Sequence, residues 1–477
     1  MTDQNPSRGS AVVAAETALA NIERWNPKTN AMLLVMADEA RRTAEALDAM
    51  SARGGWGGLL HGVTISLKDN IDVAGYRTTA ASKLLKNNVA ARDAFVVERL
   101  RRNGAIIVGK ANLHEWCFGP TSQSRHFGPC RNPWNADHVP GGSSGGSGAS
   151  VAAGMCIGSI GSDTAGSVRM PASFNGVAGL RPTAGRVSNR GSIEVSPAYD
   201  TLGPLAKRVS DVARIFAAIA AYDPEDPISV DRPGHDVLSR LNEPAGGMRI
   251  GFLRRWSLEG VDGEVGAAVE AALAAYRALG VEIVEIDLGD IERSFELFGR
   301  TVCMADGYHT HKERMAAHPE DYGEDVFSRL LIGARVTGEQ YAEGLRWAER
   351  FRLRLRTAFR HVDAILTPTT PVPAPRADID FAQAIRDLPR FVCAAPSVGV
   401  PALSVPCGFS AAGLPLSFQL TAPWFGEETL FRLGHAYQGV TDHHLRTPAP
   451  PGAEVDKNSN KSPQLNLEAV VAKLGGR

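Results

Sequence analysis

One stretch of the chain is unusually dense in glycine and serine, and it constrains the local backbone more than any other. The sequence reads GGSSGGS over 141–147 and GSDTAGSVRMP over 161–171. Glycine lacks Cβ, so it opens backbone conformations closed to other residues and lets a second group approach main-chain N–H groups. Such runs are most often flexible linkers. Here the apolar segment VAAGMCI follows at 151–157, which indicates an ordered, folded site.

Two serines in this stretch, Ser143 and Ser167, are the candidate reactive groups. A serine hydroxyl is a poor nucleophile at neutral pH, so it needs a base, and the developing oxyanion needs donors. The stretch contains no histidine, but Lys68 ends an alternating segment, 63–67, that reads as a half-buried strand at a sheet edge. Burial disfavours the charged amine, and a pKa of roughly 7 to 8 suits a general base. Lys68 is therefore predicted to take a proton from Ser143, which takes one from Ser167.

The residues just before Ser167 are small, TAG over 164–166, so consecutive amides can turn toward one point. A helix is predicted directly after Ser167, with Pro171 in its first turn, where proline is tolerated. The positive end of that helix would lie beside the developing charge.

Three other interpretations compete for these motifs. A phosphate-binding loop requires Gly-Lys-Ser/Thr after the glycines, and that sequence is absent. The segment GGSSG at 141–145 satisfies the G-x-S-x-G elbow of α/β-hydrolases, but that alternative leaves Ser167 and Lys68 without a role. A lysine taken alone is most often a solvated surface residue, and only its strand and the serine cluster argue otherwise.

Together these motifs resemble the amidase signature family, whose members use a Ser-cisSer-Lys triad. The glycine-serine pattern runs unbroken over 141–172, and the resemblance extends over most of 10–445. It implies that Ser167 is the acylated nucleophile, that Ser143 bridges from a cis Gly142–Ser143 peptide, and that Lys68 is the base. No metal or organic cofactor is implied.

The resemblance also implies supporting roles around the triad. The oxyanion donors are expected to be main-chain N–H groups, and Asp163 and Arg169 are expected to hold the loop rather than touch substrate. The candidate donors are Thr164, Ala165, Gly166 and Ser167. The segment 116–122 precedes the glycine loop and can form the wall of an acyl pocket, through Trp116, Cys117, Phe118, Thr121 and Ser122. Core packing is an equal alternative for the first three.

The family builds one large α/β/α unit around a central mixed, mostly parallel twisted sheet, and we expect that fold. Its expected parts are an N-terminal helical segment (1–59) with Pro27 separating two helices, a catalytic core (60–222), the remainder of the same domain (223–447), and a flexible C-terminal tail (448–477). Helices over 290–361 are expected to roof a substrate funnel. A capped helix is predicted from Asp262 to Gly280.

Composition limits the classes of partner and the location that we expect for this chain. The formal charge is −1 and 44% of residues are hydrophobic, which gives no electrostatic case for nucleic acid or an anionic membrane. No apolar run has the length of a membrane span and the first residues lack a secretory pattern, so a cytoplasmic location is expected. Six scattered cysteines without C-x-x-C spacing predict buried free thiols. The histidine clusters 309–311 and 443–444 give only weak support for a zinc site.

The predicted function is hydrolysis of a small-molecule amide through a seryl acyl-enzyme. Apolar or aryl amides are favoured, and esters and carbamates stay open. The alternative is a glutaminase-type amidotransferase subunit that works in a complex; a catalytically inactive binding protein is disfavoured because all three triad positions are intact. The apolar N-terminal helices are compatible with a homodimer.

Overall fold

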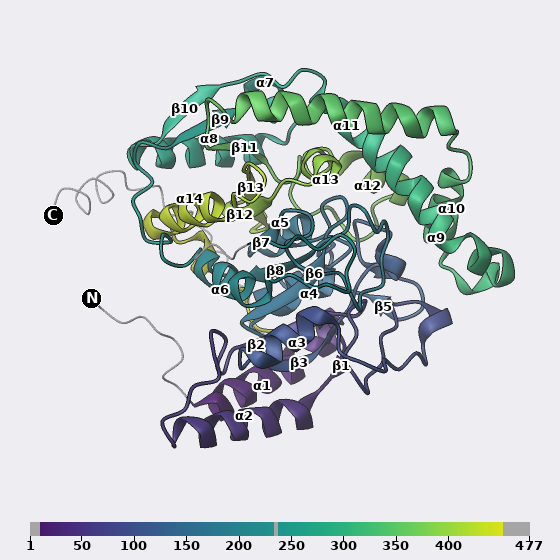
Figure 1. Cartoon of the computed structure of the whole chain (residues 1–477), viewed down its shortest axis with the longest axis vertical. Coiled ribbons are helices and arrows are strands. Elements are labelled where there is room, and N and C mark those ends of the chain that lie inside the picture. The colour runs from purple at the N-terminus through teal and green to yellow at the C-terminus, as the bar shows by residue number, and fades with distance from the viewer. Residues whose placement is uncertain (1–9, 233–236, 452–477) are drawn as a thin grey trace.

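One eleven-stranded sheet organises the molecule, and helices surround it (Figure 1). The computed structural model describes residues 10–232 and 237–451. Across the sheet the strands are β1 (Met32–Val35), β3 (Ile106–Ala111), β2 (Thr64–Lys68), β6 (Gly158–Ser162), β8 (Leu202–Ala206), β7 (Ala178–Arg181), β12 (Ala402–Phe409), β13 (Pro415–Thr421), β11 (Ala364–Pro368), β9 (Arg249–Phe252) and β10 (Glu282–Glu285). The single α/β unit with a mixed sheet is thus confirmed.

Parallel pairing occurs in two blocks of this sheet. β2 pairs in parallel with β3 and β6, and β9 pairs in parallel with β10 and β11. The strands between the blocks, and β1 at the edge, pair antiparallel. In the first block, Lys68 is the last residue of β2, and Asp163 directly follows β6.

The N-terminal segment differs from its prediction at Pro27. Helix α1 (Ala11–Thr29) contains Pro27 in its last turn and is capped by Asn30, which adopts φ 45° and whose N–H bonds the carbonyl of Asn26. The proline removes one N–H donor from the helix, and the helix ends two residues later, at Thr29. The chain then forms β1 before α2 (Ala37–Ser51), and both helices pack against β3.

The strand that delivers the lysine also differs from its prediction. β2 is buried along its whole length, and it lies between β3 and β6 rather than at a sheet edge. The alternation in the sequence is a poor guide because Thr64 and Ser66 are buried too, with Ser66 hydrogen-bonded to Ser159 at 2.8 Å. Lys68 therefore leaves the carboxyl end of an interior strand.

The predicted helix from Asp262 to Gly280 is confirmed as α8 (Gly263–Ala278). The Asp262 side chain accepts a hydrogen bond from the N–H of Glu264 at the N-terminus. Val265, Val269, Leu273 and Tyr276 lie on the buried face, as their spacing predicts.

The segment 290–361 is mainly helical, as expected. It contains η4 (Ile291–Arg293), the π-helix η5 (Phe295–Val302), α9 (Cys303–Ala317), η6 (Pro319–Asp321), α10 (Glu324–Gly333) and α11 (Gly338–Ala358). The other helices are η2 (Lys83–Leu85), α3 (Phe95–Arg102), η3 (Glu115–Cys117), α4 (Gly145–Ala152), α5 (Arg169–Asn175), α6 (Val209–Ile219), α7 (Arg254–Leu258), α12 (Phe381–Asp387), α13 (Ala394–Val398), α14 (Glu427–Val440) and η7 (His443–Leu445). Short strands β4 (Gln123–Ser124) and β5 (Gly128–Pro129) form a separate hairpin.

Three further predictions concern the membrane, the tail and the cysteines. Across 10–232 and 237–451, no helix is both long and apolar enough to span a bilayer. The predicted flexible tail lies outside the described residues from position 452 onward. All six cysteines are buried and free, as predicted.

Candidate active site

Lys68 is completely buried at the end of β2 and contacts two serine hydroxyls. Its Nζ donates to Ser143 Oγ at 2.7 Å and to Ser162 Oγ at 2.8 Å. Burial lowers the pKa of Lys68 because the charged amine loses its hydration. The predicted contact between base and relay is therefore present, in a setting that favours the neutral amine.

Ser143 is held by a tightly packed glycine loop. The Gly142–Ser143 peptide is cis, as the family resemblance implies. A Cβ on Gly142 would lie 2.3 Å from the carbonyl oxygen of Gly119, so only glycine fits there. Ser122 Oγ donates to the carbonyl of Gly141 at 2.8 Å and accepts from the N–H of Gly145 at 3.1 Å. The loop is fixed on both sides of the bridging serine.

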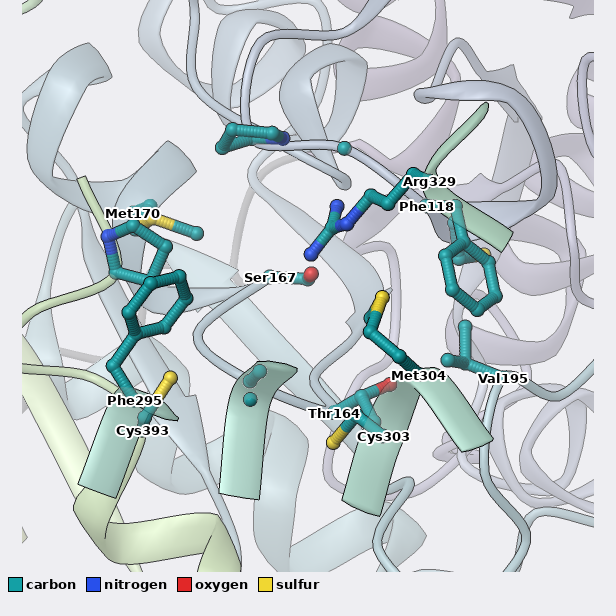
Figure 2. Close-up of a pocket in the computed structure, with 16 residues that line it drawn as sticks. Phe118, Thr164, Ser167, Met170, Val195, Phe295, Cys303, Met304, Arg329 and Cys393 are labelled. Atoms are coloured by element: carbon teal, nitrogen blue, oxygen red, sulfur yellow. The ribbon is translucent and has the colours of Figure 1, made fainter. Parts of the chain in front are cut away.

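Ser167 lies in the turn that precedes α5, at the wall of a pocket (Figure 2). Its carbonyl accepts from the N–H of Ser144 at 3.1 Å, which ties the two serine loops together. No hydrogen bond joins the Ser143 and Ser167 hydroxyls among the described residues, so that step of the relay stays a prediction. Pro171 lies in the first turn of α5, as the sequence predicts.

Asp163 organises the loop that carries Ser167. Its carboxylate accepts from Arg169 Nε at 3.0 Å and from the N–H groups of Gly166 at 2.8 Å and Val168 at 3.3 Å, and Arg181 also contacts it. Burial acts to raise the pKa of Asp163, but the charges of Arg169 and Arg181 outweigh it and lower the pKa to about 2. Asp163 is thus a fixed anion that shapes the backbone.

The candidate oxyanion amides are not equivalent. The N–H of Gly166 is engaged by Asp163, whereas those of Thr164, Ala165 and Ser167 find no acceptor within the described ranges. Gly166 adopts φ 108°, and a Cβ there would lie 2.2 Å from Val392 Cγ2, which explains the glycine. Three of the four candidate N–H groups therefore have no acceptor among the described residues, and Gly166 shapes the loop.

The pocket in front of Ser167 is mostly apolar and small. Its free volume is about 40 Å³. It is lined by Cys117, Phe118, Gly119, Pro120, Thr164, Ala165, Ser167, Met170, Val195, Phe295, Gly299, Cys303, Met304, Arg329, Pro389 and Cys393.

Of the five residues predicted to wall this pocket, Cys117 and Phe118 do so and three do not. Trp116 is turned into the core, where its ring meets His311 and Tyr322. Ser122 is used to hold the glycine loop, and Thr121 is buried away from the cavity. Trp116 and Cys117 both adopt positive φ angles, and only the second of them lines the pocket.

Arg329, from α10, is the one charged side chain among the described residues that line the cavity. Figure 2 shows its guanidinium reaching toward the Ser167 hydroxyl. Its Nε is enclosed and has no hydrogen-bond partner in the described part of the chain, and burial lowers its pKa to about 10, so it is charged at neutral pH. Sequence reasoning missed Arg329, because one arginine in an arginine-rich helical region carries no distinguishing signal.

The chain is similar to known proteins along nearly its whole length. The Amidase family model matches residues 14–431. The chain belongs to the amidase signature family. A glutamyl-tRNA(Gln) amidotransferase subunit from Synechococcus sp. (strain RCC307) is 38% identical over 466 residues, covering 92% of this chain and 95% of the relative.

Two solved structures share the fold. One, from work on a vestigial protein complex and the evolutionary origins of an s-triazine catabolic enzyme, superposes with a TM-score of 0.84 at 32% identity and covers 91% of this chain and 96% of its own. A bacterial aryl acylamidase of the amidase signature family has a TM-score of 0.82 at 23% identity, covering 92% and 95%. The latter likeness concerns the fold alone.

Proposed function

We propose that this chain hydrolyses a carbon–nitrogen amide bond through an acyl-enzyme on Ser167. The observation that carries the proposal is the buried 2.7 Å contact between Lys68 Nζ and Ser143 Oγ, beside a loop that presents Ser167 to a pocket. These two observations support Lys68 as the base, Ser143 as the relay and Ser167 as the nucleophile.

In the first half of the reaction, Ser167 Oγ attacks the substrate carbonyl carbon. The Ser167 proton passes to Ser143 Oγ while the Ser143 proton passes to the neutral amine of Lys68. The N–H groups of Thr164, Ala165 and Ser167 support an oxyanion-stabilising role, because preorganised donors act where negative charge develops. When the C–N bond breaks, Ser143 gives a proton to the departing nitrogen and regains one from Lys68. Water then attacks the acyl group by the same path.

The pocket favours a particular class of amide. Its walls are apolar and sulfur-rich, which suits the expected apolar body, but Arg329 is a cation facing Ser167 with no carboxylate among the described residues that line the cavity. A buried guanidinium pairs best with a planar anion such as a carboxylate. We therefore propose small amides whose acyl part ends in an anionic group and carries no ammonium group. Esters and carbamates with the same acyl part would undergo the same attack.

A glutaminase-type subunit is the second candidate. It is supported by the 38% identity to a glutamyl-tRNA(Gln) amidotransferase subunit over nearly the whole chain. In that case the chain would release ammonia from glutamine inside a complex and would need partner subunits. The pocket argues against free glutamine as a substrate of the chain alone, because none of its described lining residues offers a carboxylate to the α-ammonium group.

A matched pair of substrates separates the candidates. Glutarate monoamide is glutamine without the α-amino group, so the two differ only in the charge that the pocket does not match. The purified chain is expected to hydrolyse the monoamide faster than glutamine, and intact-mass measurement should detect an acyl adduct that is absent from Ser167→Ala. Activity confined to glutamine, and only in the presence of partner subunits, would support the amidotransferase alternative. An unaltered rate in Ser167→Ala would contradict both.

A further inference from the structure

Cys117 and Ser162 are neighbours of Lys68 that the proposed reaction does not use, and Cys117 is the one that also faces the pocket. Its thiol interacts directly with the Lys68 amine and accepts from Ser162 Oγ at 3.9 Å, the same hydroxyl that contacts Lys68 at 2.8 Å. Cys117 also lines the pocket. The amine is therefore surrounded by Ser143, Ser162 and Cys117.

The backbone holds Cys117 in an unfavourable conformation. Its φ is 65° and that of Trp116 is 52°, both in the left-handed region, where a residue with a Cβ is disfavoured. Within the turn the N–H of Cys117 donates to the carbonyl of His114 at 2.9 Å, and from outside it the carbonyl of Ala80 accepts from the N–H of Trp116 at 2.9 Å. Glycine would adopt this φ without strain. This chain has a cysteine there instead, whose side chain lies beside Lys68.

The charged groups that act on Lys68 are engaged elsewhere. Asp163 and Asp200 are the carboxylates that influence it. Asp163 is neutralised by Arg169 and Arg181. Asp200 accepts from the Thr164 hydroxyl and from the N–H of Val195 at 2.6 Å. Burial raises the pKa of the Cys117 thiol, so the thiol stays neutral. The direct contacts of the amine thus come from two hydroxyls and one neutral thiol.

We infer that Cys117 is a positioning residue for Lys68, whose thiol fills the third contact of the amine without supplying a charge that would hold its proton. This rests on the proposed function of Lys68 as the base. A thiol is a weak hydrogen-bonding group. It therefore fixes the amine in place and leaves the lone pair of the Lys68 nitrogen free to accept the proton of Ser143. A carboxylate at the same point would favour the ammonium form and remove the base at neutral pH.

Three substitutions at Cys117 test this through the pH profile of kcat/KM. Cys117→Asp is expected to move the rising alkaline limb to higher pH by about one unit or more, a tenfold loss at neutral pH for each unit. Cys117→Ala is expected to lower kcat by about three- to tenfold with KM nearly unchanged, since a loosened base weakens proton transfer. Cys117→Ser should restore kcat, because a hydroxyl again fills the contact.

The matched control is Cys407→Ala, which removes another buried thiol that lies on β12, outside the lining of the pocket. Its pH profile should equal that of the unmodified chain. If Cys117→Asp fails to fold, the inference is tested by the fall of kcat in Cys117→Ala and by its recovery in Cys117→Ser. Unchanged kcat and pH limb in the Cys117 variants would overturn the inference while leaving Lys68 as the base. Unchanged activity in Lys68→Met would instead contradict the proposed function itself.

Discussion

The floor and the roof of the pocket are built in different ways. The floor consists of β2, β6 and the two serine loops, where Lys68, Ser143 and Asp163 are completely buried and fixed by short-range hydrogen bonds. The roof consists of η5, α9 and α10, which contribute Phe295, Met304 and Arg329. The difference indicates that the floor sets the chemistry and the roof sets which substrate reaches it. A substitution in the floor should therefore affect every substrate equally, whereas one in the roof should discriminate between substrates.

Ser167→Ala tests the floor with the largest expected effect. Removal of the nucleophile should lower kcat by about 10³- to 10⁶-fold, the range found when a member of a catalytic triad is removed. The same loss should occur with anionic and neutral amides. The melting temperature should stay close to that of the unmodified chain, because Ser167 is only half-buried and makes no side-chain hydrogen bond to another described residue. A loss confined to one substrate would place Ser167 outside the chemistry.

Lys68→Met sharpens the same test by separating activity from stability. Loss of the base should lower kcat by about 10²- to 10⁴-fold. Burial lowers the pKa of Lys68 in the folded chain, so the unfolded chain binds more protons and stability rises with pH up to the ordinary lysine pKa. At neutral pH this lysine therefore reduces stability, and an apolar side chain of similar length should not lower the melting temperature. Differential scanning calorimetry measures this; a fall of several degrees would show that Lys68 stabilises the fold.

Asp163→Asn probes how the floor is held. The substitution leaves Arg169 and Arg181 buried without their counter-charge, and breaking a buried ion pair in this way costs about 3–5 kcal/mol of unfolding free energy. Urea denaturation should show that loss, with activity falling on all substrates. The control is Glu16→Gln, which breaks the exposed pair with Arg41 and should leave the denaturation midpoint unchanged. Equal midpoints for both variants would contradict the assigned role of Asp163.

Arg329→Met tests the roof, and its expected effect is smaller and selective. Loss of a charge-assisted contact should lower kcat/KM for glutarate monoamide by about 10- to 100-fold. A neutral amide of similar size should lose little. Arg335→Met, at an exposed position just beyond α10, is the control and should change neither value. An equal loss of kcat/KM on charged and neutral substrates would mean that Arg329 serves the reaction or the folding of the chain and does not select the substrate.

The two regions also differ in how far the sequence predicts them. Lys68, Ser143 and Ser167 belong to short motifs, and the Lys68–Ser143 contact lies where the motifs predict it. The family resemblance implies that Asp163 and Arg169 hold the loop, and they do so through the ion pair between them. The roof residues come from helices of ordinary composition, and only tertiary packing brings them to the pocket.

Two other predictions from the sequence are wrong for the same reason, because tertiary packing decides them. Burial of Thr64 and Ser66 on an interior strand depends on neighbours distant in sequence. Of Trp116 and Cys117, only the second lines the pocket, and the ring of Trp116 instead meets His311 and Tyr322, which are distant in sequence.

The most direct test of the account is the rate of Ser167 acylation as a function of pH, measured in a single turnover by intact mass. The account predicts that the rate rises with pH along one limb whose midpoint lies well below the ordinary lysine pKa of about 10.4, because burial favours the neutral amine of Lys68. The limb should vanish in Lys68→Met. A limb centred near 10.4, or a limb that persists unchanged in Lys68→Met, would contradict the proposal that a buried neutral lysine drives this reaction.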